Sequence, residues 1–191
     1  MKSLALNILD IVQNSIRAKA TAIEVAVTEN IESDTLLITI TDNGTGIPEH
    51  IADKVKDPFV TTRTTRKIGL GVPLLNFHSE LAGGKTEIES VKGKGTVIKA
   101  TFRLSHPDRQ PIGDIAGVIT MLMAANPAIG FNYHHLTPKG SFNLSSAEIK
   151  TSFGNESLSD AGFLDDLKEY IRTNLESICA DGTRREDLIY L

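Results

Sequence analysis

The chain lacks the features that would place it outside the cell or in a membrane. Among its 191 residues it has one cysteine, Cys179, so no disulfide can form within it. Its longest apolar run, from Ile115 to Ala125, is about half of what a transmembrane helix needs. The N-terminus has a single lysine, Lys2, but Asp10 and Gln13 interrupt the apolar core that an export signal requires. We therefore expect a soluble, cytoplasmic protein.

The chain also lacks a large excess of charge of one sign. Its net charge is −4, with 40% hydrophobic and 23% charged residues, which are ordinary values for a soluble globular protein. Without a basic excess, the protein has no overall field that would attract nucleic acid or an anionic membrane. No internal repeat or low-complexity tract is present. We expect neither nucleic acid nor a membrane as a partner.

The spacing of apolar residues predicts alternating helices and strands. A helix is expected at 3–18, because apolar residues form one stripe and polar residues another. The other expected elements are strands at 23–27 and 36–41, helices at 48–56 and 70–81, strands at 86–91 and 96–104, a helix at 112–125, strands at 129–134 and 141–144, and a helix at 160–178. This order predicts an α+β sandwich rich in antiparallel strands. The two prolines between residues 106 and 111 predict a boundary between regions 1–105 and 106–191.

Four short polar clusters follow one another along the first 96 residues. On the first helix, Asp10, Gln13, Asn14 and Arg17 share one face, because they are spaced three and four residues apart. The other three clusters are Asp42-Asn-Gly-Thr-Gly46 directly after a strand, Gly69-Leu-Gly71 at a helix start, and Gly93-Lys-Gly95-Thr96 between two strands. Taken singly, each has an ordinary interpretation as a solvated helix face or a turn.

In this order and at these intervals, the clusters resemble the ATP-binding domain that gyrase, heat-shock chaperones, histidine kinases and mismatch-repair ATPases share, the GHKL or Bergerat fold. The resemblance spans roughly residues 1–105. It implies a two-layer α/β sandwich, with helices on one face of a mixed, mostly antiparallel sheet, and ATP and Mg²⁺ as ligands. The residues after Asn14 are closer to the mismatch-repair ATPases, whereas the run from Leu81 to Thr96 closely resembles the end of a histidine kinase catalytic domain.

The resemblance implies a role for each cluster. Asn14 would ligate the Mg²⁺ that bridges the ATP phosphates, since Mg²⁺ takes oxygen ligands and keeps several waters. Arg17 matches a phosphate-facing lysine of histidine kinases, with an ordinary surface arginine as the equal alternative. Asp42 would accept a hydrogen bond from the adenine amino group, and Thr96 would close the adenine pocket from the far side.

A lid over the nucleotide is expected from the middle of this region. The segment from Asp57 to Arg63 resembles the phenylalanine box that opens the ATP lid of histidine kinases, and the lid itself would run over residues 62–68. The glycines after it begin a helix whose backbone N–H groups would bind phosphate. The expected nucleotide-binding residues are Asn14, Arg17, Asp42, Gly44, Gly46, Ile47, Phe59, Thr62, Arg63, Gly69, Leu70, Gly71, Val72 and Thr96.

Asp10 is the expected catalytic residue. It lies one turn before Asn14, at an interval where the related ATPases and the anti-sigma-factor kinases carry a glutamate that acts as general base. The aspartate is one methylene shorter but keeps the carboxylate that base chemistry needs. Three mechanisms stay open: a serine/threonine kinase of a partner protein, a nucleotide-switched ATPase, and a non-catalytic adenine-nucleotide sensor.

A fourth interpretation concerns His106. The segment from Ser105 to Pro111 has the spacing of a histidine kinase acceptor box, which would make the protein a rearranged histidine kinase. A strand runs directly into His106 and Pro107 follows it, so we favour a strand-to-helix turn. No helical hairpin precedes the ATP-binding region, which also disfavours a histidine kinase proper. Residues 106–191 could dimerise the protein or dock a partner.

Overall fold

Six strands and five α-helices make up the part of the chain that the computed structural model describes, residues 3–47 and 71–179. The strands are β1 (Ala22–Asn30), β2 (Thr35–Asp42), β3 (Lys85–Val91), β4 (Gly95–Arg103), β5 (Gly130–Thr137) and β6 (Gly140–Ser145). The helices are α1 (Leu4–Arg17), α3 (Gly71–Leu81), α4 (Ile115–Ala125), α5 (Ser146–Phe153) and α6 (Ala161–Ile178), and a 3₁₀ turn, η1, spans Ser157–Ser159.

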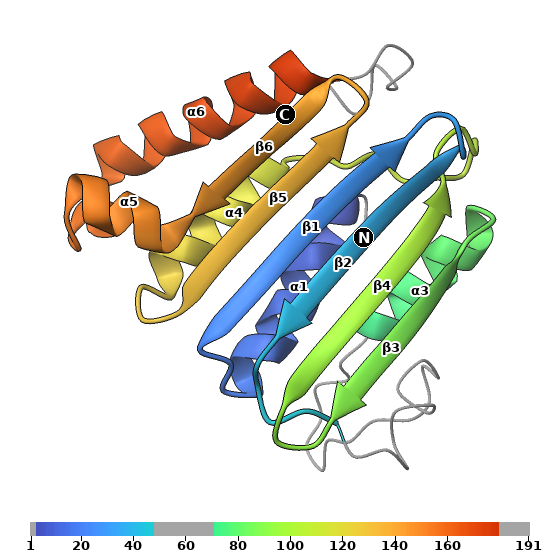
Figure 1. Ribbon diagram of the computed structural model, residues 1–191, viewed down its shortest axis with the longest axis horizontal. Helices are drawn as coiled ribbons and strands as arrows, with labels where there is room; N and C mark the ends of the chain where they lie inside the picture. The colour runs from blue at the N-terminus through green and yellow to red at the C-terminus, as the bar shows by residue number, and fades with distance from the viewer. Residues whose placement is uncertain (1–2, 48–70, 180–191) are drawn as a thin grey trace.

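The strands form one sheet in the order β3-β4-β2-β1-β5-β6. Every neighbouring pair is antiparallel except β1 and β5, which run parallel. Helices α1, α3 and α4 cover one face of this sheet, and none of the described helices lies over the other face (Figure 1). The predicted α+β class, with two layers and a mixed, mostly antiparallel sheet, is confirmed.

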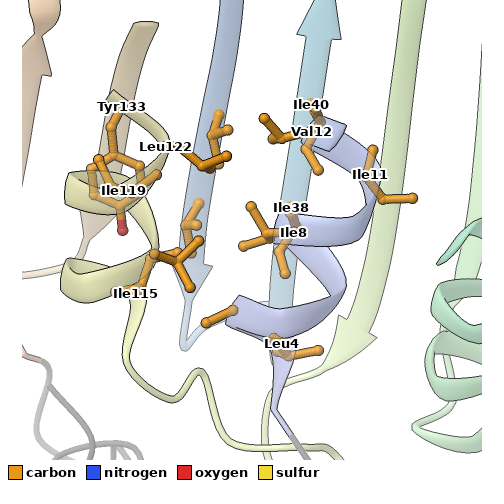
Figure 2. Close-up of a cluster of buried hydrophobic side chains, with 14 of the residues drawn as sticks. Leu4, Ile8, Ile11, Val12, Ile38, Ile40, Ile115, Ile119, Leu122 and Tyr133 are labelled. Carbon is orange, nitrogen blue, oxygen red and sulfur yellow. The ribbon is translucent and has the colours of Figure 1, made fainter. Parts of the chain in front are cut away.

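The core lies between the sheet and its helices. Strand β2 alternates buried and half-buried residues, because successive side chains point to opposite faces. Ile38 and Ile40 meet the apolar stripe of α1, and α4 packs beside α1 with Ile119 and Leu122 near Tyr133 of β5 (Figure 2). The labelled side chains of this cluster are Leu4, Ile8, Ile11, Val12, Ile38, Ile40, Ile115, Ile119, Leu122 and Tyr133. Truncating one of these aliphatic side chains to alanine would cost about 2–5 kcal/mol of unfolding free energy.

A buried polar contact joins β5 to the end of β1. His135 Nε2 lies 3.0 Å from a carboxylate oxygen of Glu29, and the Tyr133 hydroxyl lies 2.9 Å from His135 Nδ1. All three residues are buried. Burial and the nearby Glu29 carboxylate raise the pKa of Tyr133 far above its ordinary value, so the hydroxyl keeps its proton. A tyrosine that donates to Nδ1 leaves the proton of a neutral imidazole on Nε2, facing Glu29.

Some element boundaries differ from the sequence-based expectations. The helix expected at 112–125 begins at Ile115, because the Asp114 side chain caps it by accepting a hydrogen bond from the backbone N–H of Gly117. Helix α5 was not expected, since its eight residues bury little more than Ile149 and show no clear apolar period. The helix expected at 48–56 lies outside the described residues. None of the helices that the structure describes is long and apolar enough to cross a membrane.

The division into regions 1–105 and 106–191 stays a prediction. Strand β5 pairs with β1 from Ala22 opposite Gly130 to Thr28 opposite Leu136. The strands of both regions therefore belong to one continuous sheet.

Asp34 ties the turn between β1 and β2 to the end of β4. Its carboxylate accepts hydrogen bonds from Arg103 Nε at 2.7 Å, from the Ser105 backbone N–H at 2.8 Å and from the Ser105 hydroxyl at 2.7 Å. These bonds favour the ionised form, with the Arg103 bond contributing most, and lower the pKa of Asp34 from 3.8 to about 2.

We predict that Asp34→Asn destabilises the protein in a pH-dependent way. Because the folded pKa lies below the unfolded one, the charge of Asp34 contributes stability above about pH 4, and this contribution is lost as the pH falls toward 2. Asparagine tolerates the positive φ of 49° at this position, so the change adds little backbone strain. Urea unfolding midpoints should differ most between parent and variant near pH 7. A difference of the same size at pH 2 would contradict this account.

Candidate nucleotide site

The polar face of α1 lies against the first residue of α3. A Cβ atom built on Gly71 would sit 3.1 Å from the Asp10 Cβ and 3.6 Å from the Asn14 Nδ2. The first backbone N–H groups of a helix have no partner within the helix and carry a partial positive charge. An aspartate and an asparagine of α1 therefore lie beside the first described residue of α3, and this combination suits a ligand that joins phosphates with a cation.

Arg17 extends this polar face by one turn. Its guanidinium donates to Asn14 Oδ1 at 3.1 Å and to Gln13 Oε1 at 3.3 Å, and the residue is exposed. The contact adds positive charge beside the Asn14 oxygen and still leaves that oxygen a second lone pair. Both interpretations of Arg17, as a phosphate-binding residue and as a surface arginine, are compatible with this geometry.

Asp42 forms the buried end of the site. It is 9% exposed, and its two carboxylate oxygens accept hydrogen bonds from the Gly44 backbone N–H at 2.8 Å and from the Ser15 hydroxyl at 2.6 Å. Each oxygen keeps acceptor capacity for a donor such as an exocyclic amine. The residues present therefore fit an adenine base at this end.

Ser15 was missed by the sequence analysis. It follows Asn14 directly, but it points to the buried side of α1 and contacts Asp42, 27 residues away. The available signal was a small polar residue within the apolar stripe of a helix, at the level where β2 ends.

Two glycines allow the backbones around Asp42 to touch. Gly46 has φ +65°, and a Cβ there would lie 2.2 Å from the Val91 carbonyl oxygen. Gly95 has φ +115°, and a Cβ there would lie 1.9 Å from the Asp42 carbonyl oxygen. Any side chain would collide with main chain at either position. This approach brings Thr96, which is 8% exposed, opposite Asp42 on the neighbouring strand.

The structure thus gathers some of the predicted site residues into two groups. In the first group, Asp10 and Asn14 lie beside Gly71 in α3, and Arg17 is hydrogen-bonded to Asn14. A second group lies at the end of β2: Asp42, Gly44, Gly46, Ile47 and Thr96. The Val72 side chain is buried in the core, which leaves its backbone N–H as the group that could serve a ligand. Five predicted residues lie outside the described residues: Phe59, Thr62, Arg63, Gly69 and Leu70.

Comparisons with known proteins place this site in a family context. A family model described as histidine kinase-, DNA gyrase B- and HSP90-like ATPase matches residues 2–106. The nitrogen regulation protein NtrY of Azorhizobium caulinodans is 33% identical over 46% of this chain, and the sensor histidine kinase WalK of Bacillus subtilis is 37% identical over 42% of it. The aligned parts are 11% and 14% of those two proteins.

A likeness in fold extends further along the chain. A solved N-terminal domain of a DNA repair protein superposes with a TM-score of 0.54 at 22% identity. The superposition covers 82% of this chain and 58% of the other chain.

Proposed function

The chain belongs to the histidine kinase-, DNA gyrase B- and HSP90-like ATPase family, and from this membership we propose that it binds ATP with Mg²⁺ and transfers the terminal phosphoryl group. The acceptor would be water, or a serine or threonine hydroxyl of a partner protein. One observation carries the proposal: Asp10 and Asn14 meet the first residue of α3. A carboxylate base and a metal-ligating oxygen would stand together where the phosphates bind.

Helix α1 would hold the two ends of the nucleotide in register. Ser15 fixes Asp42 at the base end, and the preceding residue, Asn14, faces Gly71 at the phosphate end. Asp42 would accept a hydrogen bond from the adenine amino group, while Asn14 would supply an oxygen ligand to the metal ion. Bound Mg²⁺ would neutralise phosphate charge and orient the terminal group for in-line attack.

Asp10 would act on the nucleophile. Asp10 is half-buried and lies one helical turn before Asn14, and its carboxylate would take the proton of the attacking water or hydroxyl. As the new oxygen–phosphorus bond forms, the bond to the leaving oxygen of ADP breaks, and the proton passes to Asp10. Because the base touches only the nucleophile, the same residues could serve hydrolysis or transfer to a protein.

The position of His106 favours these acceptors over a histidine of the same chain. Thr96 stands opposite Asp42, and Arg103 stands opposite Thr35 at the other end of the same strand pair. Seven residues of strand span about 23 Å. His106 comes after Arg103, in a turn where the His106 backbone N–H donates to the Arg103 carbonyl. It therefore lies past the end of β4 that is remote from Asp42.

We predict that Asp10→Asn leaves ATP binding within about threefold and lowers turnover by about 10²- to 10⁴-fold, the usual contribution of a general base. Incubation with γ-labelled ATP, alone and with cell extract, distinguishes the mechanisms: free phosphate indicates an ATPase, and acid-stable label on a protein indicates a serine/threonine kinase. His106→Gln should behave as the parent does. Acid-labile label that maps to His106 would overturn the proposal. If the parent binds ATP but shows no turnover, the protein is a nucleotide sensor and not an enzyme.

Asp42→Asn should weaken ATP binding about 10- to 100-fold, because a charge-assisted hydrogen bond is worth about 1.5–3 kcal/mol. The amide could also turn its NH₂ group toward the adenine amino group. Titration calorimetry on the folded variant measures the loss. An unchanged affinity would remove Asp42 from the site.

For Asn14→Ala we expect loss of the Mg²⁺-dependent part of triphosphate binding, with a smaller effect on adenosine. The reason is that Asn14 would contact the metal and not the base. ATP affinity measured with Mg²⁺ and with EDTA separates the two contributions. If EDTA weakens parent and variant equally, Asn14 is not a metal ligand.

A further inference from the structure

Ser90, near the end of β3, stands at the centre of a polar cluster beside Asp42. Its hydroxyl oxygen accepts a hydrogen bond from the Ile47 backbone N–H at 2.7 Å. The hydroxyl donates to the Gly95 carbonyl oxygen at 3.0 Å, and its oxygen lies 2.8 Å from the Thr96 hydroxyl. One serine thus connects Ile47, five residues after β2, with the first two residues of β4.

The sheet register puts Ser90 in line with the base end of the site. Ser90 is paired with Thr96 across β3 and β4, and Thr96 is paired with Asp42 across β4 and β2. Residues paired in this way point to the same face of a sheet. Ser90, Thr96 and Asp42 therefore form a row of polar side chains on the helix-covered face, and Ser15 reaches Asp42 from α1.

Counting protons shows what Ser90 does to Thr96. The Ser90 hydroxyl has one proton, and it donates that proton to the Gly95 carbonyl. The hydrogen bond between Ser90 and Thr96 must then use the Thr96 proton. Ser90 thus anchors the Thr96 hydroxyl, whose oxygen keeps a lone pair that can face a ligand as an acceptor.

We propose that Ser90 is a positioning residue that sets the adenine preference of this site, an inference that rests on the proposed ATP binding. The adenine amino group carries two N–H donors, and the Asp42 carboxylate beside an accepting Thr96 oxygen matches them. Hypoxanthine presents a carbonyl oxygen at the same position, and two acceptors would repel it. Ser90 holds the Thr96 proton, so that Thr96 meets the base as an acceptor.

The same strand offers a matched control. At the other end of β3, the Thr86 hydroxyl pairs with the Ser79 hydroxyl at 2.9 Å, and both residues are buried. Thr86→Val removes a hydroxyl pair of the same kind from the same strand, about four residues away from the base end. This variant reports the effect of lost stability without a change at the site.

The test measures dissociation constants for ATP and inosine triphosphate, both with saturating Mg²⁺, in five proteins: the parent, Ser90→Ala, Ser90→Cys, Ser90→Thr and Thr86→Val. We expect Ser90→Ala and Ser90→Cys to weaken ATP binding about three- to tenfold, as the loss of a neutral hydrogen bond would, with little change for inosine triphosphate. The ratio of the two affinities should therefore fall. Ser90→Thr keeps the hydroxyl and should restore the ratio, and Thr86→Val should leave it unchanged.

The outcomes separate this inference from the function on which it rests. If the parent prefers ATP and the ratio is unchanged in folded Ser90→Ala or Ser90→Cys, Ser90 has no positioning role and the proposed function stands. An equal fall of the ratio in Thr86→Val would also overturn the role, since it would show a general effect of stability. If the parent does not bind ATP, the proposed function fails and this inference with it. The cysteine variant, nearly the same size as serine, gives the answer should the alanine variant not fold.

Discussion

The packing of α1 against the sheet is the constraint on which the rest of the site depends. Its apolar stripe, represented by Leu4, Ile8 and Ile11, is almost wholly buried. Because burial of that stripe fixes the rotation of α1 about its axis, the directions in which its other side chains point are fixed as well. Ser15 must then point at the end of β2, and the Asp10 and Asn14 side must face the start of α3. The same core that stabilises the fold sets the distance between the two ends of the candidate site.

At the base end of the candidate site, contacts between backbones, rather than side-chain packing, fix the positions of Asp42 and Thr96. The main chain at Gly46 meets Val91, and the main chain at Gly95 meets Asp42. Both approaches are so close that a Cβ atom on either glycine would collide with the opposite backbone. Side chains hop between rotamers, whereas two backbones in contact have few alternatives. The carboxylate of Asp42 and the hydroxyl of Thr96 are therefore held by three adjacent strands. Hydrogen bonds from Ser15 and Ser90 then orient the two groups.

Local patterns in the sequence predicted the parts of this site that depend on local structure. The polar face of α1 follows from helical spacing, and Asp42 was found because a turn cluster directly follows an apolar strand. Ser15 and Ser90 could not be found in this way. Asp42, the partner of Ser15, lies 27 residues away, and Ile47, one partner of Ser90, lies 43 residues away, so these contacts exist only in the folded protein. Helix α5 was missed for a related reason: it is stabilised by packing on β5 and η1 rather than by its own apolar period.

Strand β1 connects this site with the second half of the chain. It follows α1, it is hydrogen-bonded to β2 on one side, and it pairs with β5 over seven residue pairs on the other. At the end of that second pairing, Glu29 and His135 are hydrogen-bonded and almost fully buried. Separating β5 from β1 would expose apolar surface and break the hydrogen bond between Glu29 and His135. The polar contact therefore opposes sliding of β5 along β1, because any other register would leave Glu29 and His135 unpaired in the core.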